Sequence, residues 1–138
     1  MKHLIQEAGL THQFQCDSAG TSSYHIGAQP DRRMAAAAQQ RGLTLQGRSR
    51  QFHPEDFSKF DLILAMDLEN YRTLLSRDPS GQYHENIRLM CDFCRHYGDQ
   101  EVPDPYYGGT EGFTYVIDLL LDACDGLLHH LTQVKPVI

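Results

Sequence analysis

The sequence predicts an α/β domain built around a mostly parallel sheet, and three features indicate it. The apolar run "DLILA" at residues 61–65 is typical of a strand buried on both faces of a parallel sheet. Helical patterns precede and follow this run, so that strands and helices alternate along the chain. An apolar stripe at steps of three and four residues predicts one long helix near the carboxyl end, formed by Phe113, Val116, Ile117, Leu120, Leu121, Cys124, Leu127, Leu128 and Leu131.

The amino-terminal part predicts two helices separated by a strand and a loop. Residues 1–8 have apolar positions at helical spacing, and Gly9 is a suitable stop. The alternation in "QFQCDSAG", residues 13–20, predicts a strand. A loop follows and is closed by Pro30, after which a helix is expected from about Asp31 to Gly42.

The second half continues the alternation of strands and helices. Pro54 opens a short helix, and the strand at residues 61–65 follows it. Asp67 is placed to cap the next helix, which ends in the turn "DPSG" at residues 78–81. "NIRLMC", residues 86–91, predicts another short strand leading toward the stretch "EVPDPYYGG" at residues 101–109.

Composition excludes several classes of protein. The 138 residues suffice for one domain, and 41% hydrophobic with 22% charged residues is typical of a globular chain. A net charge of −6 gives no basic field to hold nucleic acid or an anionic membrane surface. No apolar run approaches the roughly 20 residues of a membrane span, and no signal peptide opens the sequence, so a cytoplasmic protein is expected.

The four cysteines are expected to be free thiols. In a cytoplasmic chain, Cys16, Cys91, Cys94 and Cys124 are more typical of buried thiols than of a disulfide framework. Cys91 and Cys94 have the C-x-x-C spacing, but no second pair completes a zinc site, so no metal and no cofactor is expected. Packing is the preferred interpretation of this pair, and a redox role is the alternative.

Asp104 is the strongest candidate for a catalytic group. It follows a predicted strand, and α/β folds place their sites at the carboxyl ends of strands. Pro103 and Pro105 restrict the backbone on both sides, so the carboxyl group is held on a stiff loop. Nearby rings would withdraw it from water, which favours the protonated form that a general acid needs. A well-made turn with an exposed aspartate is an equally good interpretation of these residues alone.

At these residues the sequence resembles the low-molecular-weight protein tyrosine phosphatases, and the bacterial branch most of all. The resemblance is carried by "CDSAGTSSYHIGAQPDRRM", "QGRSRQFHPEDFSKFDLILAMD", "NY", "DPSGQ" and "EVPDPYYGG". It covers nearly the whole chain, from the first helix to about Leu128. It implies one phosphatase domain at residues 1–131 followed by a tail at residues 132–138.

The resemblance assigns roles to four side chains. Asp104 becomes the acid that protonates the tyrosine leaving group and later activates the hydrolytic water. Tyr106 and Tyr107 line one aromatic wall of the substrate cleft, and Tyr24 lines the opposite wall. The substrate is then a phosphotyrosine protein or a small phosphomonoester.

One family motif is absent from these residues. The family's nucleophile lies in a phosphate-binding loop of the form Cys-x5-Arg-Ser, close to the amino terminus. The residues six positions after the four cysteines are Ser22, Tyr97, Gln100 and His130, and none is arginine. The first helix matches the second half of the family helix that follows this loop. A strand, the loop and two helical turns, about twenty residues, are therefore unmatched.

The absence of this loop and its strand leads to one expectation for the fold and another for activity. The expected fold is a three-layer α/β/α domain of the phosphatase type without its first, central strand, and therefore destabilised. The favoured explanation is that Met1 is an internal methionine taken as a start, and a truncation or remnant is the alternative. The 138 residues alone are expected to be inactive. Arsenate reduction, arginine phosphatase activity and a non-catalytic binding role are the competing functions.

Overall fold

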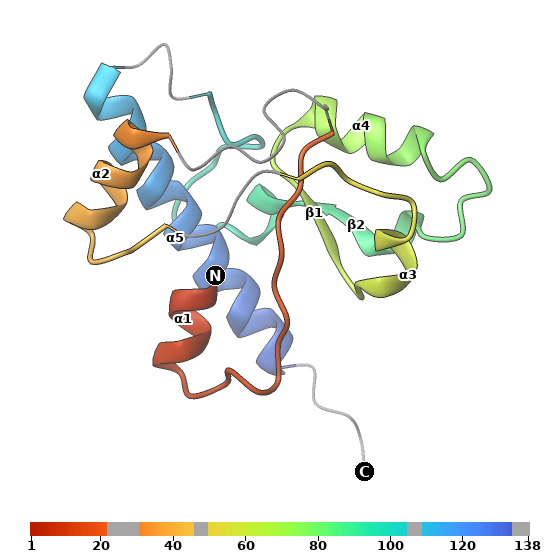
Figure 1. The fold of residues 1–138 in the computed structure, drawn as a ribbon, viewed down its shortest axis with the longest axis horizontal. Helices are drawn as coiled ribbons and strands as arrows, with labels where there is room; N and C mark the ends of the chain where they lie inside the picture. The colour runs from red at the N-terminus through yellow and green to blue at the C-terminus, as the bar shows by residue number, and fades with distance from the viewer. Residues whose placement is uncertain (22–30, 46–49, 105–108, 134–138) are drawn as a thin grey trace.

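Two short parallel strands lie between helices in the computed structural model (Figure 1), which describes residues 1–21, 31–45, 50–104 and 109–133. Part of the loop expected before Pro30, and the tail from residue 134 on, lie outside these described residues. The elements follow one another as α1 (Lys2–Glu7), α2 (Arg32–Gln40), α3 (Asp56–Lys59), β1 (Ile63–Ala65), α4 (Leu68–Ser76), η1 (His84–Asn86), β2 (Ile87–Leu89), η2 (Met90–Phe93) and α5 (Gly109–Gln133).

The sheet separates two apolar cores. β1 pairs with β2 in parallel register, with Ile63 opposite Ile87 and Ala65 opposite Leu89. Because successive side chains of a strand point to opposite faces, Ile63 and Ala65 pack with residues of α3 and α4, whereas Leu62 and Leu64 pack against α5. The predicted α/β class, with helices on both faces of a parallel sheet, is confirmed.

The predicted helices form where their end signals place them. The Asp31 side chain accepts the backbone N–H of Arg33 at 2.8 Å and so caps α2. Asp67 caps α4 in the same way, through the N–H of Asn70 at 2.7 Å. Gly9, just after α1, has a φ of 72°, a left-handed conformation that favours glycine and ends the helix.

The strand predicted at residues 13–20 is wrong. Residues 14–19 belong to no strand, and this segment joins the fold through an isolated parallel bridge between Gly20 and Gln51. Gly20 donates its N–H to the carbonyl of Arg50 and accepts the N–H of Phe52, each at 2.8 Å. An alternating sequence becomes a strand only when a neighbouring strand pairs with it, and within the described residues none lies beside 14–19.

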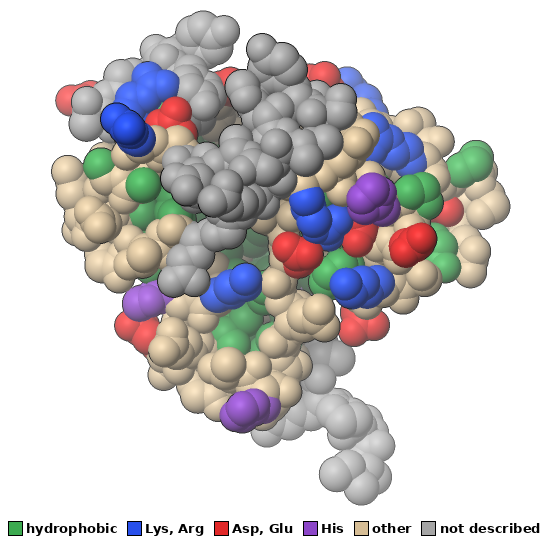
Figure 2. Space-filling view, viewed as in Figure 1, with side chains coloured by type: hydrophobic (Ala, Val, Ile, Leu, Met, Phe, Trp, Pro, Cys, Tyr) green, Lys and Arg blue, Asp and Glu red, His purple; other side chains and the backbone are tan. Residues whose placement is uncertain are grey.

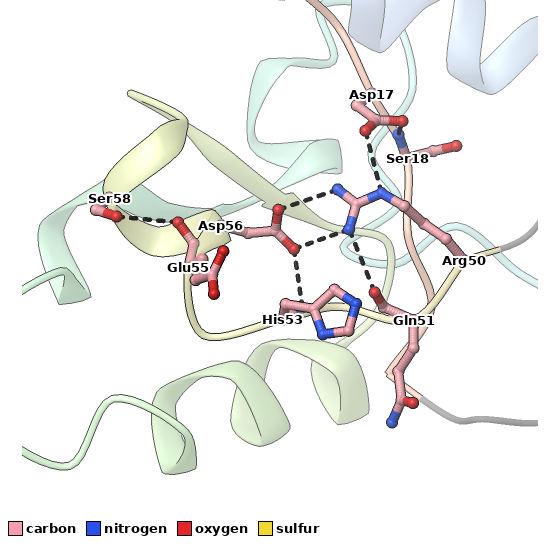
Figure 3. A network of polar contacts seen from close by, with 8 residues as sticks. All are labelled: Asp17, Ser18, Arg50, Gln51, His53, Glu55, Asp56 and Ser58. Atoms are coloured by element: carbon pink, nitrogen blue, oxygen red, sulfur yellow. Dashed lines mark hydrogen bonds and ion pairs between the residues drawn. The ribbon is translucent and has the colours of Figure 1, made fainter.

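Arg50 fastens this segment to the rest of the fold (Figure 3). Its guanidinium donates to both carboxylate oxygens of Asp56, at 2.9 and 3.1 Å, and to Asp17 at 3.1 Å. Asp56 also accepts the N–H of His53 at 2.8 Å, which shapes the turn into α3. One arginine therefore ties the extended segment, the bridge residues and α3 together.

Helix α5 is the largest contributor to the core. Its stripe packs on α2 at one end, where Phe113 and Ile117 contact Ala37 and Ala38. Further along, Ala123 and Leu127 pack with Met90 and Phe93 of η2. The predicted stripe is confirmed, since Phe113, Val116, Ile117, Leu127 and Leu128 are buried. No helix in the described ranges is both long and apolar enough to cross a bilayer.

The contact between α5 and η2 depends on Gly126. A Cβ atom at this position would lie 1.9 Å from the carbonyl oxygen of Phe93, far inside van der Waals contact. Glycine in a helix interior is about 1 kcal/mol less favourable than alanine. The close approach of the two backbones explains why glycine stands here.

We therefore expect Gly126→Ala to destabilise the protein although alanine favours helix. Overpacking of this kind costs about 1–3 kcal/mol of unfolding free energy, and urea denaturation measures it. Gly98→Ala is the matched control, because a Cβ at Gly98 meets nothing within 4 Å, and its effect should stay below about 0.5 kcal/mol. A Gly126→Ala protein as stable as the parent would contradict the packing described here.

The Arg50 pair makes stability depend on acid pH. Burial acts to raise the pKa of Asp56, but the hydrogen bonds from Arg50 and His53 lower it below the ordinary value of 3.8. Since the folded pKa lies below the unfolded one, the ionised carboxylate stabilises the fold above about pH 4, and this contribution disappears as the pH falls through the folded pKa.

Asp56→Asn should accordingly lower the unfolding free energy at neutral pH by about 1–3 kcal/mol. Its stability should also change less than that of the parent between pH 5 and pH 2. Thermal unfolding across this range provides the measurement. Asp17→Asn, which removes the more exposed partner of the same arginine, should cost less than about 1 kcal/mol at neutral pH. Parallel pH curves for the parent and Asp56→Asn would contradict this account.

Candidate functional site

A shallow depression lies beyond the carboxyl ends of the two strands. Its volume is about 380 Å³, and it is lined by Asp67, Asp99, Gln100, Glu101, Val102, Pro103 and Asp104. Asp67 follows β1, whereas residues 99–104 belong to the chain that continues from β2 through η2. This is the edge at which parallel α/β sheets place their sites.

Two hydrogen bonds hold the second of these segments against the first. The N–H of Val102 donates to the carbonyl of Met66 at 2.8 Å. The Glu101 carboxylate accepts the N–H of Leu68 at 2.7 Å, at the amino end of α4. A carboxylate is favoured there because it meets unpaired N–H groups and the positive end of the helix dipole. Residues 101 and 102 therefore have fixed places beside β1 and α4.

The structure places Asp104 on the wall of this depression, with its side chain exposed. Pro103 is exposed as well, so the described neighbours do not supply the apolar cover expected from the sequence. Tyr106 and Tyr107 follow directly, but they lie outside the described residues, as does Tyr24. Asp104 is thus the one predicted site residue for which a position can be given.

The chain enters the segment that carries Tyr24 from the surface of α4. The Thr21 carbonyl accepts a hydrogen bond from Arg77 at 2.7 Å, and the Thr21 hydroxyl accepts one from the Asn70 amide at 3.2 Å. Asn70 lies in the first turn of α4, close to Asp67 in the chain. Thr21, the last described residue before this segment, is therefore held in place by α4 and the residue that follows it.

The lining of the depression is strongly acidic. Four of its seven residues carry carboxyl groups, and none is a lysine, an arginine or a cysteine. Figure 2 shows no such excess on the molecular face that it presents, where described acidic and basic side chains are intermixed. A dianionic phosphate monoester would be repelled by this lining unless further groups supplied positive charge or N–H donors.

Sequence reasoning missed the residues that hold the chain between η2 and the depression. The buried Asp122 of α5 accepts three successive backbone N–H groups, those of Arg95, His96 and Tyr97, at 2.9 to 3.1 Å. Burial acts to raise the pKa of Asp122, but these donors lower it below its usual range. The signal available in the sequence was Asp122 between Leu121 and Ala123, in the apolar stripe of the predicted helix.

A tyrosine pair adds a second attachment in the same region. The Tyr115 hydroxyl donates to Asp99 at 2.7 Å, and this hydrogen bond, with some burial, raises the pKa of Tyr115 to about 12. The rings of Tyr97 and Tyr115 meet edge to face, with their centroids 5.5 Å apart. Helix α5 therefore contacts residues 95–99 through both polar and aromatic groups.

The environment of the C-x-x-C pair is unsuited to reactive thiols. Cys91 is buried, and burial raises its pKa. Burial, together with neighbouring Cys91 and Asp122, raises the pKa of Cys94 to about 12. Because the thiolate is the nucleophile and the metal ligand, these raised pKa values disfavour the reactive form of both cysteines at neutral pH. Packing accounts for the pair, and no metal-binding group of side chains occurs in the described residues.

Comparison with known proteins agrees with the motifs in the sequence. The family model for low molecular weight phosphotyrosine protein phosphatase matches residues 1–136. A putative low molecular weight protein-tyrosine-phosphatase of Synechocystis is 59% identical over 131 residues, which are 95% of this chain and 83% of the relative.

Solved structures show the same fold. A protein tyrosine phosphatase of Entamoeba histolytica, crystallised with Hepes in the active site, has a TM-score of 0.92 and 48% identity, covering 98% of this chain and 86% of that one. Drosophila arginine phosphatase has a TM-score of 0.86 and 29% identity over 97% of this chain and 86% of its own. The chain belongs to the low-molecular-weight phosphotyrosine protein phosphatase family, whose members are phosphomonoester hydrolases.

Proposed function

We propose that this chain supplies the general acid of a protein tyrosine phosphatase, and that Asp104 is that acid. The supporting observation is its position: an exposed carboxyl group on the wall of a depression, at the edge of the sheet where α/β sites form. Pro103 and Pro105 restrict the backbone on both sides, which limits the directions in which the carboxyl group can point.

The reaction follows the two-step course expected of the family. A cysteine thiolate attacks phosphorus, the bond from phosphorus to the tyrosine oxygen breaks, and Asp104 gives its proton to the departing oxygen. A phenolate has a conjugate acid with a pKa of about 10, so protonation as it leaves lowers the barrier. The ionised Asp104 then takes a proton from water as that water attacks the cysteinyl phosphate, which releases inorganic phosphate and the thiolate.

Three tyrosines are proposed to hold the substrate ring. Tyr106 and Tyr107 follow Asp104 by two and three residues in the sequence. Tyr24 comes three residues after Thr21, whose place on α4 is fixed by Asn70 and Arg77. Aromatic walls on either side of a flat phenyl ring provide apolar contact and select an aryl ester over a smaller phosphomonoester.

The 138 residues on their own are proposed to be inactive. None of the four cysteines has an arginine six positions later, and none lines the described part of the depression. Its four carboxyl groups would also oppose phosphate binding. The described residues therefore supply no group that we can assign as nucleophile or phosphate cradle.

Phosphoarginine is the second candidate substrate, because the Drosophila arginine phosphatase shares this fold at 29% identity. Arsenate reduction is less well supported, since it needs reactive thiols and the pKa values of Cys91 and Cys94 are raised. A purely binding role is also less well supported, because the acidic depression offers little affinity for a phosphotyrosine peptide. The four free cysteines fit a reducing cytoplasm, where we place the reaction.

The purified 138-residue chain should not hydrolyse p-nitrophenyl phosphate above background. Extending it at the amino terminus with the strand, Cys-x5-Arg loop and helical turns of a family member should produce turnover and a higher melting temperature. Replacing the cysteine of the added loop by serine is the matched control and should abolish turnover without lowering the melting temperature. Hydrolysis by the unextended chain that disappears in Asp104→Asn would contradict the proposal.

In the extended chain, Asp104→Asn should act selectively on poor leaving groups. For phenyl phosphate we expect kcat/KM to fall by about 10²–10⁴. This constant covers only the steps up to the cysteinyl phosphate, so it leaves out the water attack that Asp104 also assists. For dinitrophenyl phosphate, whose leaving group needs no proton, the loss should stay below about tenfold. Asp92→Asn is the control and should change neither rate, because Asp92 is an exposed carboxylate of η2 that pairs with Arg88 of β2. An equal loss on both substrates would show that Asp104 is not the general acid.

A further inference from the structure

The chain between η2 and Asp104 is attached to the fold at successive points. Residues 95–97 are held by Asp122, and Asp99 is held by the Tyr115 hydroxyl. Further along, Glu101 and Val102 are bound to the amino end of α4 and to the residue after β1. Asp104 follows two residues after the last of these points. For convenience, residues 95–104 are called the acid arm.

Of these attachments, the one made by Asp122 restricts the backbone conformation most. A single oxygen, Oδ2, accepts the N–H groups of three consecutive residues, Arg95 at 3.0 Å, His96 at 2.9 Å and Tyr97 at 3.1 Å. Three successive N–H groups converge on one point only when the backbone forms a concave turn around it. Because Asp122 is 9% exposed, water cannot readily replace the carboxylate. Asp122 therefore fixes the conformation at the start of the arm as well as its location.

The contact between the rings of Tyr97 and Tyr115 sets the direction in which the arm leaves this turn. Tyr97, the last residue bound to Asp122, lies edge to face on Tyr115. Tyr115 and Asp122 lie on the same helix, two turns apart, and Tyr115 also binds Asp99. A rigid helix thus holds the arm at both ends of a five-residue stretch. Only four residues separate that stretch from Asp104, and each is either hydrogen-bonded to the fold or next to a residue that is.

We propose that Asp122 is a positioning residue for Asp104, acting through the acid arm, and the proposal rests on the general-acid role proposed above. General acid catalysis requires the carboxyl group to lie within hydrogen-bond reach of the leaving oxygen. A displacement of the arm would leave the nucleophile and the phosphate site intact but would move the proton donor. Asp122 binds the backbone N–H groups of residues 95–97 and neighbours the Cys94 thiol just before them, so it reaches Asp104 only through the conformation of the arm.

The first test concerns the 138-residue chain and needs no activity. Backbone amide hydrogen exchange should become about tenfold faster, or more, at Arg95, His96 and Tyr97 in Asp122→Asn, because a neutral acceptor replaces a charged one. The proposal also requires faster exchange at Val102, beyond the direct contacts. Asp118→Asn is the matched control: it lies one turn earlier on α5 and binds Arg41, so exchange in the arm should not change. Unchanged exchange at Val102 in Asp122→Asn would overturn the proposal.

The second test uses the extended, active chain and distinguishes positioning from a loss of fold. Asp122→Asn should lower kcat/KM for phenyl phosphate about tenfold while changing kcat/KM for dinitrophenyl phosphate less than about threefold, because this constant isolates the step in which the leaving group departs. The difference between the losses on the two esters should be larger for Asp122→Ala, if that variant folds, and smaller for Tyr115→Phe. Equal losses on both substrates would assign Asp122 a structural role only and overturn the proposal. If the extended parent hydrolyses neither ester, the proposed function fails, and the exchange experiment alone decides whether Asp122 holds the arm.

Discussion

The close contact of α5 with the chain after β2 determines how this molecule is arranged. Gly126 allows the helix backbone to reach the carbonyl of Phe93, and Asp122, one turn earlier, gathers the N–H groups of residues 95–97. A larger residue at 126 would push the two backbones apart, and the carboxylate could then no longer reach its three donors. The position of the depression beside β1 follows from this contact, because its second wall is the continuation of the same chain.

The described part of the site has one kind of charge. The carboxylates of Asp67 and Glu101 accept backbone N–H groups at the amino end of α4. Asp99 accepts the Tyr115 hydroxyl, and Asp104 lines the depression. Three of these four acids are thus accounted for by the fold itself. An anionic substrate can enter such a place only if opposing positive groups outweigh the repulsion. Under the proposed function, the acid and the groups that bind the anion therefore have to come from different parts of the site.

Local signals predicted most of the helices, whereas features that depend on distant partners were missed. Asp31 and Asp67 cap α2 and α4 as their sequences indicate, and the stripe of α5 is buried as its spacing predicts. Residues 14–19 alternate like a strand but have no described neighbour to pair with, a fact that no local pattern contains. Asp122 was missed for the same reason, since its three donors lie more than twenty residues earlier in the chain. Asp104 could be singled out because its motif is contiguous, and its role stays a prediction.

The long sequence separation of the contacts made by α5 has a consequence for biosynthesis. Arg41, which follows α2, binds Asp118 of α5, 77 residues later in the chain. Helix α5 also covers the apolar faces of both α2 and η2. A ribosome delivers α5 after every other element described here, so those faces stay uncovered while the nascent chain grows. Chains in this condition are prone to aggregate and are recognised by chaperones. Burial of these two faces therefore requires α5 to have left the exit tunnel.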